Sequence, residues 1–202
     1  MSAGAALTAR GITRRYGSRV ALEPTDLDVN AGEIVVLLGP NGAGKSTLLA
    51  LLAGALPPTA GDVASELPAA VIGWAPQRPA QYRRLSAREN LELFARLLRL
   101  ASPEAAAAEL IAEFELPPDQ PSGQLSVGNQ QRLNLAIAFL GAPRILLLDE
   151  PTASLDPEHA RGLWRRVRRA RERGAGAVVA THFLDETVEA DRVLTLQDGR
   201  LT

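Results

Sequence analysis

The order of apolar and polar positions along the chain predicts alternating strands and helices. Short or alternating apolar segments are typical of strands over Ala6–Ile12, Val20–Val29 and Glu33–Leu38. We expect these three segments to form an N-terminal β region. A further apolar run, Ala70–Trp74, predicts a buried strand after the turn-rich segment Pro57–Asp62, so the sheet is expected to resume there.

The middle of the chain, approximately residues 81–140, has a helical pattern instead. Ser86 and Glu89 are spaced as a capping box, and apolar residues then recur at helical spacing. A second helix follows Ser102, and another amphipathic helix begins near Ser126 after a stretch rich in proline. We therefore expect an all-helical subdomain inserted between strands.

The closing third of the chain alternates strand and helix again. The predicted strands are Arg144–Leu148, Ala177–Ala180 and Arg192–Leu196, and the predicted helices are Pro157–Arg173 and Phe183–Glu189. Such alternation is typical of a parallel sheet with right-handed crossovers. The expected fold is α/β, with a single domain over residues 1–202 whose core comprises residues 1–80 and 141–202.

Composition and charge narrow the functions that the chain can have. The 202 residues include 22 basic and 23 acidic residues, no cysteine and two histidines. These numbers exclude disulfides and thiolate ligands and favour no nucleic-acid partner, so the arginine-rich stretch 161–173 is interpreted as a solvated helix face. No apolar run approaches the about 20 residues of a membrane helix, and Met1–Arg10 lacks the layout of a secretion signal. We expect a soluble protein of a reducing cytosol.

A glycine-rich turn follows the apolar run Ile34–Leu38 and opens the apolar stretch Leu48–Leu52. A strand, a glycine turn and a helix in this order are typical of a phosphate-binding loop. Backbone N–H groups close around phosphate oxygens, Lys45 adds a positive charge, and Ser46 is placed to ligate Mg²⁺. The predicted loop comprises Gly39, Pro40, Asn41, Gly42, Ala43, Gly44, Lys45, Ser46 and Thr47. An ordinary turn that caps a helix is the alternative, but the register of these residues favours a nucleoside triphosphate site.

Two carboxylates follow the continuously apolar segment Ile145–Leu148, which is typical of a central parallel strand. We expect Asp149 to hold Mg²⁺ opposite Ser46, and Glu150 to polarise the water that attacks the γ-phosphate. The alternative is a buried strand that runs into a solvated acidic turn. The phosphate-binding loop favours the catalytic interpretation.

Several motifs, taken in order, resemble those of the ATP-binding subunits of ABC transporters over nearly the full length of the chain. After the phosphate-binding loop come Trp74–Gln77, similar to the Q-loop; Leu125–Arg132, similar to the family signature; Asp149–Thr152, similar to the second acidic motif; Ser154–Asp156, similar to the D-loop; and Thr181–His182, similar to the switch histidine. The resemblance implies a P-loop NTPase core with a mostly parallel sheet, an N-terminal antiparallel β region and an inserted helical subdomain.

The resemblance also implies roles for single residues. In the family, the Q-loop glutamine, here Gln77, senses Mg²⁺ and the attacking water. His182 follows the strand Ala177–Ala180 and is expected at the same sheet edge as Glu150, where it could hydrogen-bond the γ-phosphate and hold the water. Tyr16 occupies the place of the ring that stacks on adenine in the family. The alternatives are a structural histidine and a half-buried strand tyrosine.

The signature segment, Leu125–Arg132, places Ser126 and Gly128 at a helix start, where N–H donors and the helix dipole can face an anion. In the family that anion is ATP held by the other subunit, although Ser126 is also a plain N-cap. The segment departs from the family pattern at Val127, which replaces the usual first glycine, and at Asn129, which replaces the usual glutamine. A β-branched residue restricts the backbone, so we expect weaker or slower closure on the nucleotide.

The resemblance implies an Mg²⁺-dependent ATPase subunit of an ABC transporter, most like small exporter-type or haem-exporter ATPases. Its cofactors would be ATP and Mg²⁺. Its partners would be an integral membrane permease and a second ATPase subunit, in a homodimer or a heterodimer, with no nucleic acid. The expected location is cytoplasmic, peripheral on the cytoplasmic face of the cell membrane through the permease. A soluble ABC-type ATPase without a permease is the alternative.

Overall fold

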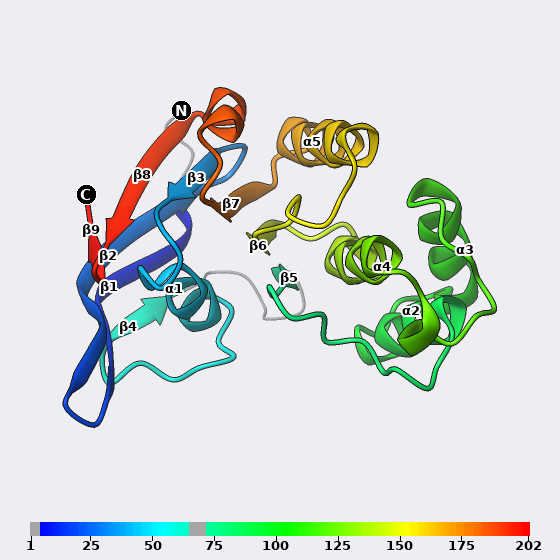
Figure 1. The fold of residues 1–202 in the computed structure, drawn as a ribbon, viewed down its shortest axis with the longest axis horizontal. Coiled ribbons are helices and arrows are strands. Elements are labelled where there is room, and N and C mark those ends of the chain that lie inside the picture. The colour runs from blue at the N-terminus through cyan, green and yellow to red at the C-terminus, as the bar shows by residue number, and fades with distance from the viewer. Residues whose placement is uncertain (1–4, 65–71) are drawn as a thin grey trace.

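Helix α1 (Lys45–Leu52) lies between two β-sheets (Figure 1). The computed structural model describes residues 5–64 and 72–202. The smaller sheet is antiparallel, in the order β2-β1-β4, and comprises β1 (Ala5–Tyr16), β2 (Arg19–Asn30) and β4 (Ala60–Ala64). The leucines of α1 are buried between this sheet and the larger one, so the helix is fixed from both sides.

The larger sheet has the strand order β5-β6-β7-β3-β8-β9. Its strands are β3 (Ile34–Leu38), β5 (Ile72–Ala75), β6 (Ile145–Asp149), β7 (Gly176–Thr181), β8 (Arg192–Gln197) and β9 (Arg200–Leu201). All pairings are parallel except that of β8 with β9. Ile145 and Leu147 pack on the α1 side, whereas Leu146 and Leu148 pack on the opposite side. Burial on both faces explains why β6 is continuously apolar.

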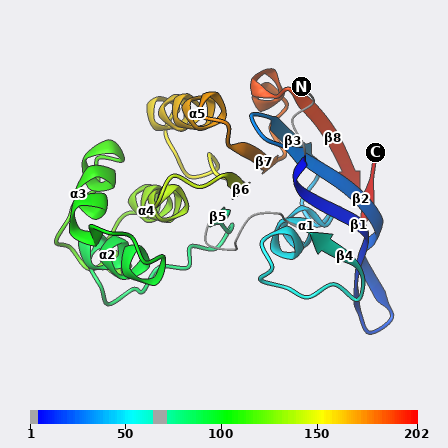
Figure 2. The same cartoon turned by 180° about the vertical axis from the view of Figure 1, so that it is seen from behind.

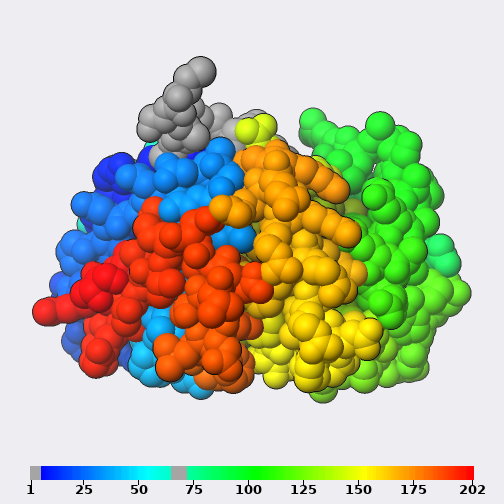
Figure 3. Space-filling model, turned by 90° about the horizontal axis from the view of Figure 1, so that it is seen from above, coloured from blue at the N-terminus to red at the C-terminus, as the bar shows by residue number. Residues whose placement is uncertain are grey.

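The remaining helices cover the far face of the larger sheet and extend away from it (Figure 2). They are α2 (Ala87–Leu97), α3 (Pro103–Glu113), α4 (Val127–Phe139) and α5 (Pro157–Glu172), with 3₁₀ turns at Ser122–Gln124 and Leu184–Glu189. Helices α2, α3 and α4 lie between β5 and β6 in the chain and form the helical subdomain. Seen from above, α5 lies between this subdomain and the C-terminal strands (Figure 3). The fold confirms the predicted α/β class.

The predicted capping box of the first helix is present. The Ser86 side chain accepts a hydrogen bond from the Glu89 N–H, and Glu89 accepts one from the Ser86 N–H at 2.7 Å. Asn90, fully buried, orders the segment before this helix: its Oδ1 accepts from the Tyr82 N–H at 2.8 Å, and its Nδ2 donates to the Tyr82 carbonyl at 3.1 Å. A buried amide with its polar atoms satisfied fixes one conformation of the loop over residues 82–86.

The expectation that Glu33–Leu38 joins the N-terminal β region is wrong. Strand β3 lies in the larger sheet, where it pairs in parallel with β7 and β8. Ile34, Val35, Val36 and Leu37 are all buried, as both faces of a central parallel strand must be. The turn after β2 therefore carries the chain from one sheet to the other.

Three local predictions also differ from the structure. Residues 57–62 were expected as turns, but Ala60–Ala64 forms the edge strand β4, whose mostly exposed residues carry no alternation. The short strand β9 was not predicted. The expected helix Phe183–Glu189 is a 3₁₀ turn without a buried residue. Of the predicted strand Ala70–Trp74, residues 70 and 71 lie outside the described residues, and β5 begins at Ile72.

The arginine-rich face of α5 is only partly solvated. Leu163, Trp164 and Val167 are buried against the core. On the polar side three arginines form ion pairs: Arg166 with Glu113, Arg168 with Glu189, and Arg171 with Asp191. Within residues 5–64 and 72–202, every helix is too short or too polar to cross a bilayer.

Candidate active site

The turn between β3 and α1 is closely packed, which explains its glycines. A side chain at Gly39 would lie 2.2 Å from the Leu196 carbonyl oxygen, and one at Gly44 would lie 2.7 Å from the Ala21 carbonyl oxygen. Gly44 also has a φ of +110°, which residues with a side chain rarely adopt. Because these two positions are glycine, the turn can adopt this tightly packed conformation, which suits backbone N–H groups to binding an anion.

Lys45 is buried at the base of this turn. Its Nζ donates to the Gly39 carbonyl at 2.6 Å and to the Pro40 carbonyl at 3.2 Å. It also forms an ion pair with Glu150 Oε1 at 3.1 Å, and the two side chains are only 5% and 4% exposed. At such burial, removal of either partner would leave the other charge without compensation.

Glu150 occupies an unusual backbone conformation directly after β6. Its φ is +49°, a left-handed value that costs a non-glycine residue about 1–2 kcal/mol. The Glu150 N–H donates to the Ala180 carbonyl at 2.9 Å, which holds this conformation against β7. The carboxylate is thereby directed toward Lys45, and its Oε2 lies 2.7 Å from His182 Nδ1. Strain retained at a buried charged position is typical of a functional site.

Asp149 is the last residue of β6 and is 3% exposed. Burial raises its pKa and the Glu150 charge adds to the rise, whereas the Ser46 hydroxyl, the Lys45 charge and the Gln77 backbone N–H lower it. Asp149 Oδ1 is buried without a hydrogen-bond partner among the described residues. A buried carboxylate oxygen without a partner, close to a serine hydroxyl, is suited to an oxygen-binding cation such as Mg²⁺.

Lys45 and Glu150 border a cleft of about 560 Å³. It is lined by the predicted residues Tyr16, Pro40, Asn41, Gly42, Gly44, Lys45, Ser46, Thr47, Gln77 and Glu150. Tyr16 is 50% exposed, and the Arg14 guanidinium stacks 4.7 Å from its ring centroid. A ring supported in this way has the geometry expected of a stacking platform for a base.

The sequence analysis missed part of the cleft wall, namely Arg19, Val20, Ala21, Asp198 and Gly199. Asp198 and Gly199 form the turn between β8 and β9, and the Gly199 N–H donates to the Ala43 carbonyl at 2.9 Å. This turn supports the glycine loop from behind. Asp198-Gly199 is a strong turn signal in the sequence. Its position beside Ala43, however, depends on β8 being the neighbour of β3 in the larger sheet.

Ser126 and Gly128 do not line the cleft within this chain, as far as the described residues show. Ser126 caps α4, because its hydroxyl accepts a hydrogen bond from the Asn129 N–H at 3.2 Å. Val127 is 69% exposed. A side chain at Gly128 would lie 3.2 Å from the Ser154 carbonyl oxygen, so this glycine permits close packing of the signature segment on the D-loop.

His159, in the first turn of α5, is only partly exposed. Its side chain is 28% exposed and contacts two residues: Nδ1 lies 2.6 Å from Asp156 Oδ2, and Nε2 lies 2.8 Å from Arg132 Nη1. Asp156 is three residues earlier on the same helix turn, a spacing visible in the sequence. Arg132 belongs to a different helix, so only the tertiary structure brings it there.

Comparison with known families decides to which family this site belongs. Residues 22–153 match the ABC transporter family. The chain belongs to the ABC transporter family. Among solved structures, the ABC transporter chain resembles a dimeric, post-hydrolysis ATP-binding cassette bound to ADP and Pi, with 27% identity, a TM-score of 0.88 and 97% of each chain covered. The comparison confirms the P-loop NTPase fold.

Two curated relatives of this ABC family chain are named for export or drug resistance. The chain is 38% identical over 210 residues to the Nod factor export ATP-binding protein I of Sinorhizobium fredii. This alignment covers 96% of this chain and 61% of the relative. It is 38% identical over 213 residues to the daunorubicin resistance ATP-binding protein DrrA3 of Streptomyces coeruleorubidus, with 98% and 67% covered. The chain therefore spans about two thirds or less of the length of these relatives.

Proposed function

We propose that this chain hydrolyses ATP in a dimer of cassettes and thereby drives transport through a separate membrane permease. The observation that supports this most strongly is the series Lys45–Glu150–His182 beside the cleft, with contacts of 3.1 and 2.7 Å, in which Lys45 and Glu150 are buried and His182 is partly exposed. A phosphate loop alone would bind nucleotide. A buried carboxylate next to a histidine at the same sheet edge adds what hydrolysis requires, a base and a group that orients it.

The contacts of Lys45 indicate how nucleotide would activate the site. Its ammonium group now donates to two loop carbonyls and pairs with Glu150. Phosphate oxygens in the cleft would compete for this ammonium group, because they carry more charge than a carbonyl. Glu150 Oε1 would then be free to accept a proton from water, while His182 holds Oε2 in place.

The residues at the end of β6 fit a divalent cation. Ser46 and Asp149 would hold Mg²⁺, with Gln77 at the rim of the same cleft. When bound, the ion would neutralise charge on the β- and γ-phosphates. Asp149 must be ionised to bind the ion. Burial raises the pKa of Asp149 and so disfavours its charged form, and a bound cation would stabilise that form.

A second ATPase subunit would complete the site. Ser126 and Gly128 lie outside the cleft of their own chain, at the exposed start of α4. The helix start presents N–H groups suited to an anion, and a nucleotide held by a partner subunit is the anion that the family arrangement provides. A dimeric cassette among the similar structures supports this arrangement. A homodimer and a heterodimer satisfy it equally.

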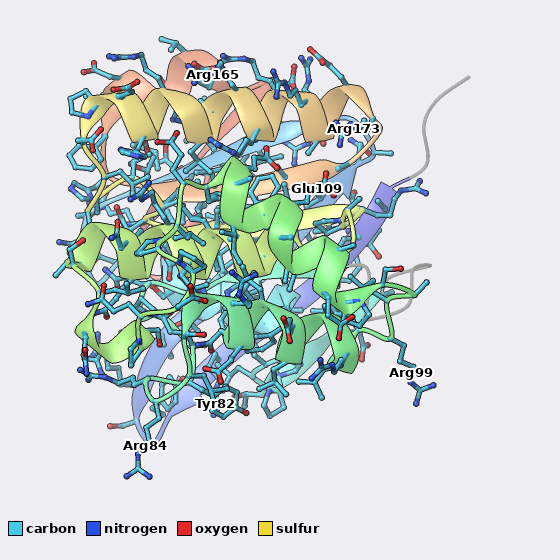
Figure 4. All side chains as sticks on the ribbon, turned by 90° about the vertical axis from the view of Figure 1, so that its right-hand side faces the viewer. Tyr82, Arg84, Arg99, Glu109, Arg165 and Arg173 are labelled. Atoms are coloured by element: carbon cyan, nitrogen blue, oxygen red, sulfur yellow. The ribbon has the colours of Figure 1, made fainter. Side chains whose placement is uncertain are left out.

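The permease would dock on the segment that links the catalytic core to the helical subdomain, residues 77–88. Tyr82 is 55% exposed there, and Arg84 is exposed beside it. Both lie on the opposite side of the helical subdomain from Arg165 and Arg173 of α5 (Figure 4). Because hydrogen bonds from Asn90 hold this segment on α2, movement of the whole subdomain would be transmitted to a docked permease helix. The chain would then sit peripherally on the cytoplasmic face of the membrane, and the relatives favour export.

The dimer is tested with Glu150→Gln, which should retain nucleotide binding but slow hydrolysis. We expect Mg²⁺-ATP to convert this variant from monomer to dimer in size-exclusion chromatography with light scattering. Adding Ser126→Arg should abolish the dimer, whereas Ser102→Arg, at the equally exposed cap of α3, should leave it intact. A monomer in saturating ATP, or a dimer that tolerates Ser126→Arg, would count against the shared site.

A further inference from the structure

We infer that His159, in its neutral form, is a positioning residue that fastens the signature helix to the D-loop, so that protonation of His159 slows closure on ATP. The inference rests on the proposed function. It concerns a histidine outside the cleft that the proposed ATP chemistry does not use. Among the described residues, side chains of α4 form three hydrogen bonds that lead to the catalytic loops, and of these only the one through His159 involves a histidine.

Helix α4 donates hydrogen bonds to two other loops through amide side chains. Asn134 Nδ2 donates to the Pro76 carbonyl at 2.8 Å, next to Gln77, and Gln131 Nε2 donates to the Pro151 carbonyl at 3.0 Å, next to Glu150. Neither amide changes charge with pH. The helix that carries Ser126 is thus connected to the Q-loop and to the second acidic motif by contacts that are insensitive to acid.

The third contact runs from Arg132 through His159 to Asp156. Arg132 Nη1 can only donate, so His159 Nε2, at 2.8 Å, must accept. Asp156 Oδ2 accepts, so the Nδ1 proton of His159 is donated across 2.6 Å. The imidazole is therefore neutral with its proton on Nδ1, and in this form it satisfies both neighbours.

Both ends of this bridge are fixed by further contacts. Asp156 caps α5, because its Oδ1 accepts from the N–H groups of Glu158 and His159 at 3.0 Å each. Arg132 also donates to the Phe114 carbonyl at 3.0 Å and to Asn129 Oδ1. Movement of the imidazole would therefore be transmitted to the start of α4 and to the D-loop together.

Protonation of His159 would place a second N–H on Nε2, facing the N–H of Arg132. Two donors and two positive charges would then meet at a distance that now holds a hydrogen bond. The bond to Asp156 would survive and strengthen. The other charged residues around this ring are Glu115, Glu158, Arg165 and Arg166, which line the same small cavity and balance in sign. Acid would thus release Arg132 while His159 stays on Asp156.

The test compares His159→Gln with the wild type between pH 6 and 8, the range in which histidine changes charge. Glutamine offers Arg132 an oxygen acceptor and does not titrate. We expect equal kcat for ATP hydrolysis at pH 8, and at pH 6 a wild-type kcat about threefold to tenfold below that of His159→Gln, as loss of one hydrogen bond implies. Taking the ratio of the two kcat values cancels pH effects that are common to both proteins.

His159→Phe is the matched control, because it keeps a planar ring but bonds to neither neighbour. It should have lower kcat than the wild type at pH 8 with an unchanged KM for ATP, since Tyr16 and the phosphate loop are untouched. If the ratio of the wild-type kcat to the His159→Gln kcat stays constant from pH 6 to 8, the inference is overturned. Full activity of His159→Phe at pH 8 would also overturn it.

Thermal unfolding separates this inference from the proposed function. The wild type should unfold at the same temperature as His159→Gln at pH 8 and at a lower temperature at pH 6. If the wild type hydrolyses no ATP at any pH, the proposed function fails, while that pH-dependent difference in unfolding temperature still supports the bridge. Equal unfolding temperatures at both pH values would contradict it.

Discussion

Replacement of Lys45 by methionine would leave a buried carboxylate without its ion-pair partner. Lys45 Nζ and Glu150 Oε1 are 3.1 Å apart, and neither side chain is more than 5% exposed. Removing one member of such a pair costs about 3–5 kcal/mol, because the remaining charge stays buried. His182 remains 2.7 Å from the other Glu150 oxygen, which places the expected loss at the lower end, about 3 kcal/mol.

A double-mutant cycle isolates this interaction. Lys45→Met should lower the unfolding temperature by about 6–12 °C, from about 3 kcal/mol in a domain of this size. Lys45→Met combined with Glu150→Gln removes both charges and should recover the wild-type free energy of unfolding to within about 1 kcal/mol. Urea unfolding followed by tryptophan fluorescence measures each variant, since Trp164 is buried.

A coupling energy below about 0.5 kcal/mol would refute the argument, because contacting residues in a buried pair must couple more strongly. The same variant tests the phosphate loop. Lys45→Met, like Lys45→Ala, should abolish ATP binding in equilibrium titration, since the ammonium group supplies the full positive charge beside the phosphates. Unchanged ATP affinity would contradict the assignment of Gly39–Thr47 as that loop.

Two further predictions concern residues at the edges of the site. Val127→Gly should raise the steady-state ATPase rate, because the exposed β-branched residue slows closure. Val127→Ala should give an intermediate rate. A fall in the rate with glycine would show that reasoning to be wrong. Asp149→Asn should raise the unfolding temperature at pH 7 and remove Mg²⁺-dependent hydrolysis. Burial raises the pKa of Asp149, so its charge destabilises the fold above the ordinary aspartate pKa. The gain from asparagine should shrink as pH falls below the raised pKa and be absent below about 4. An unfolding temperature that drops at pH 7, or the same gain at pH 3, would disprove this account.

Local patterns in the sequence were enough to predict the loops that carry the chemistry. Gly39–Thr47, Asp149-Glu150 and His182 each directly follow a short apolar strand, and parallel strands end at one sheet edge. That rule was enough to predict that Glu150 and His182 would lie at the same sheet edge, and in the structure Glu150 contacts both Lys45 and His182. Local signals also predicted the caps at Ser86 and Ser126, because capping depends on residues three positions apart.

Tertiary structure alone decided the features that depend on which segments become neighbours. Strand β3 was assigned to the wrong sheet, because an apolar run looks the same beside either one. The turn at Asp198-Gly199 supports the phosphate loop only through the strand order around β8. His159 contacts Arg132, 27 positions away, because the fold brings the first turn of α5 close to α4. Such contacts leave no periodic or local pattern in the sequence. Residue spacing therefore predicts the residues of the candidate active site but not the contact between Arg132 and His159 beside it.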